Sequence, residues 1–147
     1  MREFRFRGKR VDTGEWMHGG VFTDACGDAY IVVNEEEIHG DAPPAIELYV
    51  MEYKVDPQTV GQWTGFQDTN SCDIYEDDIL RAWESDTSYW TGRVRRHESG
   101  EWQVRLFNAT RWAEDVLWII LRRGFRTVEV IGNTHDNPEL LGGGSHE

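Results

Sequence analysis

Residues 60–80, VGQWTGFQDTNSCDIYEDDIL, constrain the fold more than any other part of the sequence. Short runs of β-forming residues alternate there with clusters of polar turn residues. Asp68, Asn70 and Ser71 form one such cluster, because short polar side chains hydrogen-bond their own backbone and Asn tolerates a left-handed conformation. The stretch therefore predicts a strand, a tight turn, a short strand, an acidic turn and a further strand.

Alternating apolar and polar residues predict further strands on both sides of this stretch. The clearest examples are residues 2–7, 46–53, 89–97 and 102–107. The last two predict a hairpin, since a loop that contains Gly100 separates them.

Shorter strands are expected elsewhere, at residues 16–17, 21–22, 30–33 and 125–131. Gly19 and Gly20 are expected to form a turn between the first two. Residues 30–33 are β-rich without alternation, which is typical of a strand buried on both faces.

Residues 34–44 predict an exposed loop, because three consecutive glutamates lead into Gly40 and the Pro43-Pro44 pair. This loop is also the best candidate for a domain boundary. The expected organisation is an N-terminal β subdomain (1–40), a core (45–141) and a flexible, glycine-rich tail (142–147).

The apolar spacing changes from two to three or four over residues 109–123, which predicts one amphipathic helix. Trp112, Val116 and Ile120 would share its apolar face, and Gly124 would end it. The fold class is therefore mainly β: a small antiparallel barrel, or two packed sheets, with one amphipathic helix.

Charge and cysteine content limit the partners and the compartment. The net charge is −12, and residues 11–92 hold two basic against eighteen acidic side chains, which argues against non-specific nucleic-acid binding. No apolar run approaches membrane-spanning length, and the basic start lacks the apolar segment of a signal peptide, so a cytoplasmic protein is expected. Cys26 and Cys72 lack metal or redox spacing and are expected as free thiols.

The sequence contains no pattern typical of a catalytic, metal or cofactor site. Residues 68–73 begin like a calcium loop but have Ile79 where a bidentate Glu is required. The five histidines lie too far apart for a zinc motif, and neither a nucleophile elbow nor a phosphate-binding loop occurs. We therefore expect no metal, no cofactor and, on balance, no catalysis.

Arginines and tryptophans interleave on the hairpin expected at residues 89–107. The candidate binding residues are Arg93, Arg95, Arg105, Trp90 and Trp102. Basic side chains beside aromatic rings are typical of nucleotide and single-strand sites. The alternative interpretation is a solvated face whose arginines pair with the acidic middle of the chain.

Three blocks of sequence resemble the YopX family. The central block, QWTGFQD followed by IYEDDI, is similar to the family's central signature. REFRFR at the start and VEVIGNTHDNPELL near the end are similar to its opening and closing blocks. The residues of this chain that match the signature are Gly65, Asp68, Asn70, Tyr75, Glu76, Asp78, Gly132, Asn133, Asn137 and Pro138.

Two turn glycines of the family pattern are replaced here by Ser71 and Asp77. Glycine at such positions usually serves a positive φ, and Asn70 and Asp77 are of the next most tolerant residue types, so we expect the turns to survive with altered shape.

The resemblance implies a small phage or prophage accessory protein whose family has no assigned molecular function and offers no catalytic residues. We expect a non-catalytic binding module in the cytoplasm of a bacterial host, acting on a host protein, because Trp, Tyr and Arg are preferred interface anchors. One alternative is a nucleotide-signal or nucleic-acid binder that uses the arginine hairpin. Another is an acidic mimic of DNA. Self-association is also expected, since seven tryptophans exceed what a small β-domain readily buries.

Overall fold

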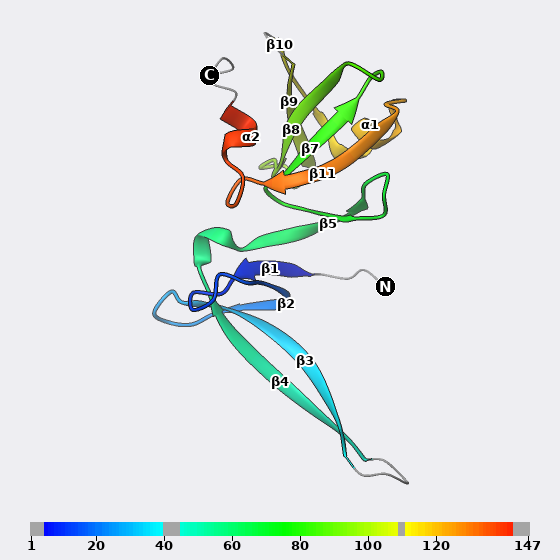
Figure 1. The fold of residues 1–147 in the computed structure, drawn as a ribbon. Helices are drawn as coiled ribbons and strands as arrows, with labels where there is room; N and C mark the ends of the chain where they lie inside the picture. The colour runs from blue at the N-terminus through cyan, green and yellow to red at the C-terminus, as the bar shows by residue number, and fades with distance from the viewer. Residues whose placement is uncertain (1–4, 40–44, 109–110, 143–147) are drawn as a thin grey trace. The chain divides into compact units, whose positions relative to one another are not determined.

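The computed structural model describes residues 5–39, 45–108 and 111–142, with the backbone alone for 35–39, 45–49 and 142. The chain divides into two compact units, Met1–Gln62 and Trp63–Glu147. Each is an antiparallel β structure in its own right (Figure 1). The domain limits expected from the sequence state which parts of the chain would fold independently. They stay a prediction.

The first unit is a meander of four strands whose first strand also pairs with the start of a fifth. The strands are β1 (Phe6–Lys9), β2 (Trp16–Thr23), β3 (Ala29–His39) and β4 (Ala45–Val55). The 3-10 turn η1 (Pro57–Thr59) follows, capped by the side chain of Asp56, and leads to β5 (Gly61–Gln67). The strand order is β4-β3-β2-β1-β5. A small core forms around Ile31 and Val55.

Two sequence expectations fail in this unit for identifiable reasons. Gly19 and Gly20 lie within the single strand β2 instead of forming a turn. A Cβ on Gly19 would stand 2.2 Å from the carbonyl oxygen of Val32, so this glycine serves close approach between strands. Residues 30–33 are not buried on both faces either, because only Ile31 among them is buried.

Residues 34–39 were expected in a loop but continue β3, since that strand pairs with β4 along its whole length. The remainder of the expected loop, 40–44, lies outside the described residues. β2 pairs with β3 only from Ala29 to Val32. The rest of the β3–β4 hairpin is therefore a two-stranded arm.

The second unit contains the five-stranded sheet on which the candidate site lies. The central stretch forms β5, β6 (Asp73–Tyr75) and β7 (Asp78–Trp83) as predicted. The hairpin β8 (Tyr89–Arg96) and β9 (Trp102–Asn108) is also confirmed. With β10 (Arg111–Val116) and β11 (Thr127–Asn133) the order is β10-β9-β8-β7-β11. The short helix α2 (Glu139–Gly142) follows.

The prediction of a helix over residues 109–123 is mostly wrong. Residues 111–116 form the edge strand β10, and only Leu117–Arg122 form the helix α1. Trp112 pairs with Phe107 in the β10–β9 ladder and is 47% exposed, so it does not share a buried face with Ile120. The three-and-four spacing is real only from Leu117 onward, where Leu117 and Ile120 are buried.

One face of the five-stranded sheet, here called the inner face, carries the hydrophobic core. Its buried members are Ile74, Leu80, Ala82, Trp90, Val94, Val104, Leu106, Leu117, Ile120 and Val128. The fold class is thus mainly β, with two antiparallel sheets that are open over the described residues and with few helices. No helix in the described part of the chain is long and apolar enough to cross a membrane.

Gly92 sets how closely the core packs on the inner face. A Cβ there would stand 2.6 Å from both Leu106 Cδ2 and Val104 Cγ1. We expect Gly92→Ala to lower the free energy of unfolding by about 1–3 kcal/mol, because overpacking forces buried side chains to shift. Urea unfolding followed by tryptophan fluorescence measures this change in the free energy of unfolding.

Gly20→Ala is the matched control, since nothing lies within 4 Å of a Cβ at Gly20 and its strand position tolerates a side chain. An unfolding free energy for Gly92→Ala equal to that of the control would contradict this account of the inner face.

Candidate functional site

The residues that match the YopX signature build turns. Asp68 is buried, and its carboxylate accepts hydrogen bonds from the backbone N–H groups of Asn70, Cys72 and Val130 at 2.8–2.9 Å. The first two bonds close the β5–β6 turn and the third ties that turn to β11. Asp78 is buried too and accepts from the Tyr75 N–H at 2.7 Å. These carboxylates therefore hold the scaffold together.

The closing signature block forms a second turn, after β11. Asn133 Oδ1 accepts from the N–H groups of His135 and Asp136 at 3.0 and 2.9 Å. Asn137 in turn donates its N–H to the Asn133 carbonyl at 2.8 Å. A Cβ on Gly132 would stand 2.4 Å from Asn137 Oδ1, which explains the glycine.

The two departures from the family pattern keep the glycine-like backbone. Ser71 has φ 64° and Asp77 has φ 71°, both in the left-handed region. The turn positions are thus preserved, with Ser71 rather than Asn70 taking the positive φ. The Asp77 carboxylate also binds Arg93 at 2.8 Å and lies 3.3 Å from His135 Nε2.

The structure separates the binding residues predicted on the β8–β9 hairpin. Arg93, Arg95 and Arg105 are exposed on the face opposite the core, here called the outer face. Trp90 is buried on the inner face, and Trp102 packs against the same core. Strand alternation therefore places these three arginines and the two tryptophans on opposite faces. Arg96, one residue further along β8, does lie 5.8 Å from the Trp102 ring centre.

Different aromatic residues accompany the arginines on the outer face. Trp83 and Tyr89 lie opposite each other on β7 and β8, with ring centres 4.8 Å apart. The Arg81 guanidinium lies 4.4 Å from the centre of the Tyr89 ring.

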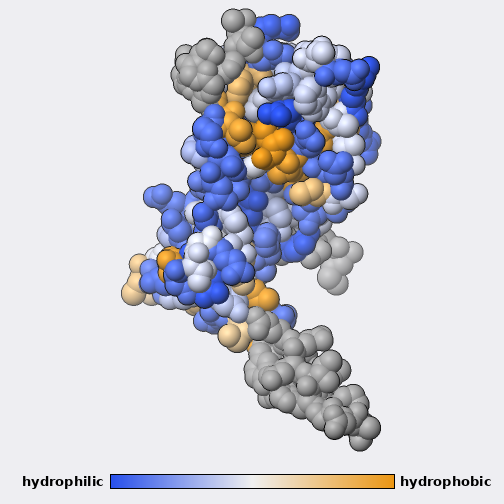
Figure 2. Space-filling view, viewed as in Figure 1, coloured by the Kyte–Doolittle hydropathy of each residue, from blue (hydrophilic) through white to orange (hydrophobic). Residues whose placement is uncertain are grey.

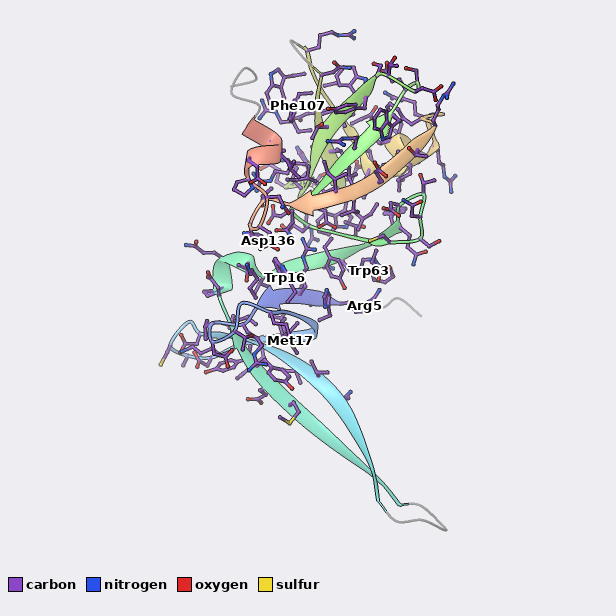
Figure 3. All side chains as sticks on the ribbon, in the orientation of Figure 1. Arg5, Trp16, Met17, Trp63, Phe107 and Asp136 are labelled. Atoms are coloured by element: carbon purple, nitrogen blue, oxygen red, sulfur yellow. The ribbon has the colours of Figure 1, made fainter. Side chains whose placement is uncertain are left out.

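A second aromatic pair lies on β9 and β10. Phe107 and Trp112 have ring centres 5.0 Å apart, and Arg105 lies 4.6 Å from the Trp112 ring (Phe107 is labelled in Figure 3). We call the whole set the aromatic–arginine face: Arg81, Trp83, Tyr89, Arg93, Arg95, Arg105, Phe107 and Trp112.

Acidic side chains match part of the charge on this face. Arg93 is paired with Asp77, and Arg105 lies 3.9 Å from Glu114 on the neighbouring strand. Glu129 accepts from Trp83 Nε1 at 3.2 Å. Pairing of hairpin arginines with acidic residues from the middle of the chain is thus observed for Arg93.

Sequence reasoning missed most of the aromatic–arginine face. Alternation along residues 79–91 places Trp83 and Tyr89 on the face of Arg81, so that pair could have been found. The position of Trp112 on this face could not have been found in the same way, because the apolar spacing of residues 109–123 predicts a helix there. Both cysteines are free and exposed, and among the described residues no three His, Cys, Asp or Glu side chains gather as a metal ion requires.

Asp68→Ala is expected to destabilise the second unit by about 2–4 kcal/mol, because three backbone donors lose their acceptor. Thermal and urea unfolding measure the loss. Glu98→Ala, in the exposed β8–β9 loop, is the control and should unfold like the parent protein. An Asp68→Ala protein as stable as that control would show that the carboxylate does not hold the turn on β11.

Comparisons with known proteins agree with these features. The chain is similar to the crystal structure of protein EF1440 from Enterococcus faecalis, with 21% sequence identity, a TM-score of 0.56, and coverage of 96% of this chain and 99% of that one. At this identity the likeness shows the fold. No curated protein matches. The model of the YopX protein family matches residues 5–142, nearly the whole length, and the chain therefore belongs to the YopX family.

Proposed function

We propose that this YopX protein is a non-catalytic binding module that presents the aromatic–arginine face to a protein partner. The observation that carries the proposal is the exposure of Tyr89 and Trp112, 39% and 47%, each in tilted contact with a second ring and approached by an arginine. Tyr, Trp and Arg dominate binding energy at protein interfaces. Rings already held by a neighbour lose little entropy on binding.

The charge of this face favours a protein over a nucleic acid. Affinity for nucleic acid depends on arginines and lysines that neutralise phosphates. Here Arg93 is paired with Asp77, and Arg105 lies beside Glu114. The chain as a whole carries −12. A partner that offers both apolar groups and a few carboxylates fits the face better than a phosphate backbone does.

The family resemblance suggests where such a partner would be found. A phage or prophage accessory protein would meet its target in the cytoplasm of the bacterial host, so we propose a host protein. The side drawn in Figure 2 is mainly hydrophilic, with hydrophobic residues gathered on the Trp63–Glu147 unit. Self-association through such patches stays a prediction.

Trp112→Ala tests the proposal, with Trp118→Ala as the matched control. Trp118 is 49% exposed, against 47% for Trp112, but belongs to α1. The tagged chain is used to capture proteins from lysate of the bacterium that encodes it, once without nuclease and once with it, and the captured protein is then purified and titrated. Loss of Trp112 should weaken its affinity at least about tenfold, as for an interface anchor.

Equal affinity of the two variants for the captured protein would rule out the aromatic–arginine face as its binding surface. So would a capture that nuclease abolishes, because nucleic acid would then bridge the two proteins. Both variants are first shown to melt cooperatively at similar temperatures.

A nucleotide or single-strand binder is the second candidate, because Arg93, Arg95 and Arg105 do lie on one exposed face. Arg95→Ala together with Arg105→Ala should then weaken binding to a short single strand, and the affinity should fall steeply with salt. Arg122→Ala on α1 is the control. Absence of binding up to millimolar strand and nucleotide removes this candidate.

The acidic turn gives little support to the alternative proposal that the protein is an acidic mimic of DNA. Asp78 is 2% exposed and binds the Tyr75 N–H, and Asp77 is paired with Arg93. Neither carboxylate is therefore presented as a DNA phosphate would be.

A further inference from the structure

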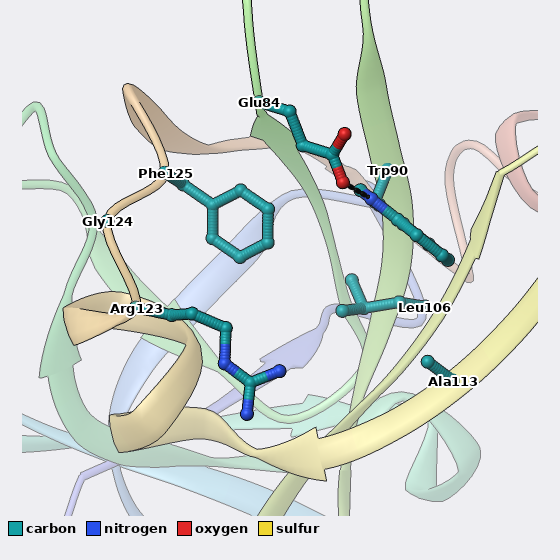
Figure 4. Close-up of a pocket in the computed structure, with 7 residues that line it drawn as sticks. All are labelled: Glu84, Trp90, Leu106, Ala113, Arg123, Gly124 and Phe125. Atoms are coloured by element: carbon teal, nitrogen blue, oxygen red, sulfur yellow. Dashed lines mark hydrogen bonds between the residues drawn. The ribbon is translucent and has the colours of Figure 1, made fainter.

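We propose that a cavity on the inner face of the five-stranded sheet binds a small aromatic carboxylate. The cavity measures ≈ 350 Å³, within the range of small-molecule sites. Its lining comes from β8, β9, β10, the end of β7 and the segment after α1 (Figure 4): Glu84, Trp90, Leu106, Ala113, Arg123, Gly124 and Phe125. It opens on the opposite face of the sheet from the aromatic–arginine face, because Leu106 and Phe107 alternate.

The walls of the cavity suit a ligand with a flat, apolar ring. The rings of Trp90 and Phe125 stand on two sides of it, and Leu106 and Ala113 form a third (Figure 4). Trp90 is held in place, since its Nε1 donates to the Glu84 carboxylate and the Arg111 guanidinium lies 5.4 Å from its ring centre. An aromatic ligand ring between these walls gains offset or edge contacts with both residues.

A cationic and an anionic group lie at separate places on the lining. The Arg123 side chain points into the cavity (Figure 4), and the Asp115 carboxylate on β10 pairs with its guanidinium. A guanidinium has five N–H donors, so one carboxylate partner leaves donors for a ligand anion. Glu84 stands at the other end of the space and accepts from Trp90. A carboxylate oxygen has further lone pairs, so Glu84 can accept from a ligand as well.

The lining therefore specifies an aromatic ring with a carboxylate at one end and a hydrogen-bond donor at the other. The carboxylate would pair with the Arg123 guanidinium. The donor would reach Glu84. A ligand with a positive charge at the first end is disfavoured, because it would meet the guanidinium.

4-Hydroxyphenylacetate is the probe for this inference. It carries a ring, a carboxylate and a hydroxyl donor. Its amide removes the charge, and 4-hydroxyphenylethylamine reverses it. Titrations followed by ¹H–¹⁵N NMR should shift the Trp90 indole N–H resonance, with the carboxylate binding at least about tenfold more tightly than the amide, as one charge-assisted pair allows.

Two variants locate the binding. Arg123→Gln should weaken the probe at least about tenfold and erase its preference over the amide. Ala113→Phe fills the cavity without changing its charge and should abolish binding. Arg122→Gln, on the exposed side of α1, is the control and should bind like the parent protein.

Equal affinities for the carboxylate, the amide and the amine would overturn the inference. So would unchanged affinity of the Ala113→Phe protein, or no binding at millimolar probe. None of these results bears on the aromatic–arginine face, which the Trp112→Ala experiment tests separately.

Discussion

The buried carboxylate of Asp68 is the interaction on which the second unit depends. It accepts from the turn that joins β5 to β6 and from Val130 on β11, residues far apart in the sequence. Thr69 adds two further bonds to the same strand, through its N–H and its hydroxyl oxygen. An ionised carboxylate that accepts several N–H groups forms strong hydrogen bonds when water is excluded. The central stretch and the closing block of the family pattern thus form one connected piece of structure.

This connection gives the residues of the family signature a structural role in this chain. Asp68, Asp78, Asn133 and Asn137 each accept a hydrogen bond from a backbone N–H group with a side-chain oxygen. Their spacing follows from turn geometry, and Gly132 fits it by leaving room for Asn137. What the family pattern preserves in this chain is therefore a scaffold.

The five-stranded sheet displays two different surfaces because its side chains alternate. On β9, Leu106 faces the core and the cavity, whereas Phe107 and Arg105 face outward. Gly92 allows Leu106 and Val104 to lie close against β8 on the inner side. The outer side collects paired aromatic rings and arginines, and the inner side leaves a space beside Trp90. A protein partner and a small ligand could then be accommodated without competition.

The sequence by itself determined the local structure wherever one spacing of apolar residues dominated a segment. The strands of residues 60–80 and the β8–β9 hairpin follow from alternation and turn residues, and the positive φ expected at the replaced turn glycines follows from the family pattern. Only the tertiary structure decided which side of a strand meets the core and whether an apolar segment pairs as a strand or forms a helix. Residues 111–116 are a strand because β9 offers an edge to pair with, and Gly19 lies in a strand because it pairs with Phe6 of β1. Its lack of a side chain leaves room for the Val32 carbonyl. The cavity and the Phe107–Trp112 part of the aromatic–arginine face depend on such long-range pairings, which no local pattern of residues encodes.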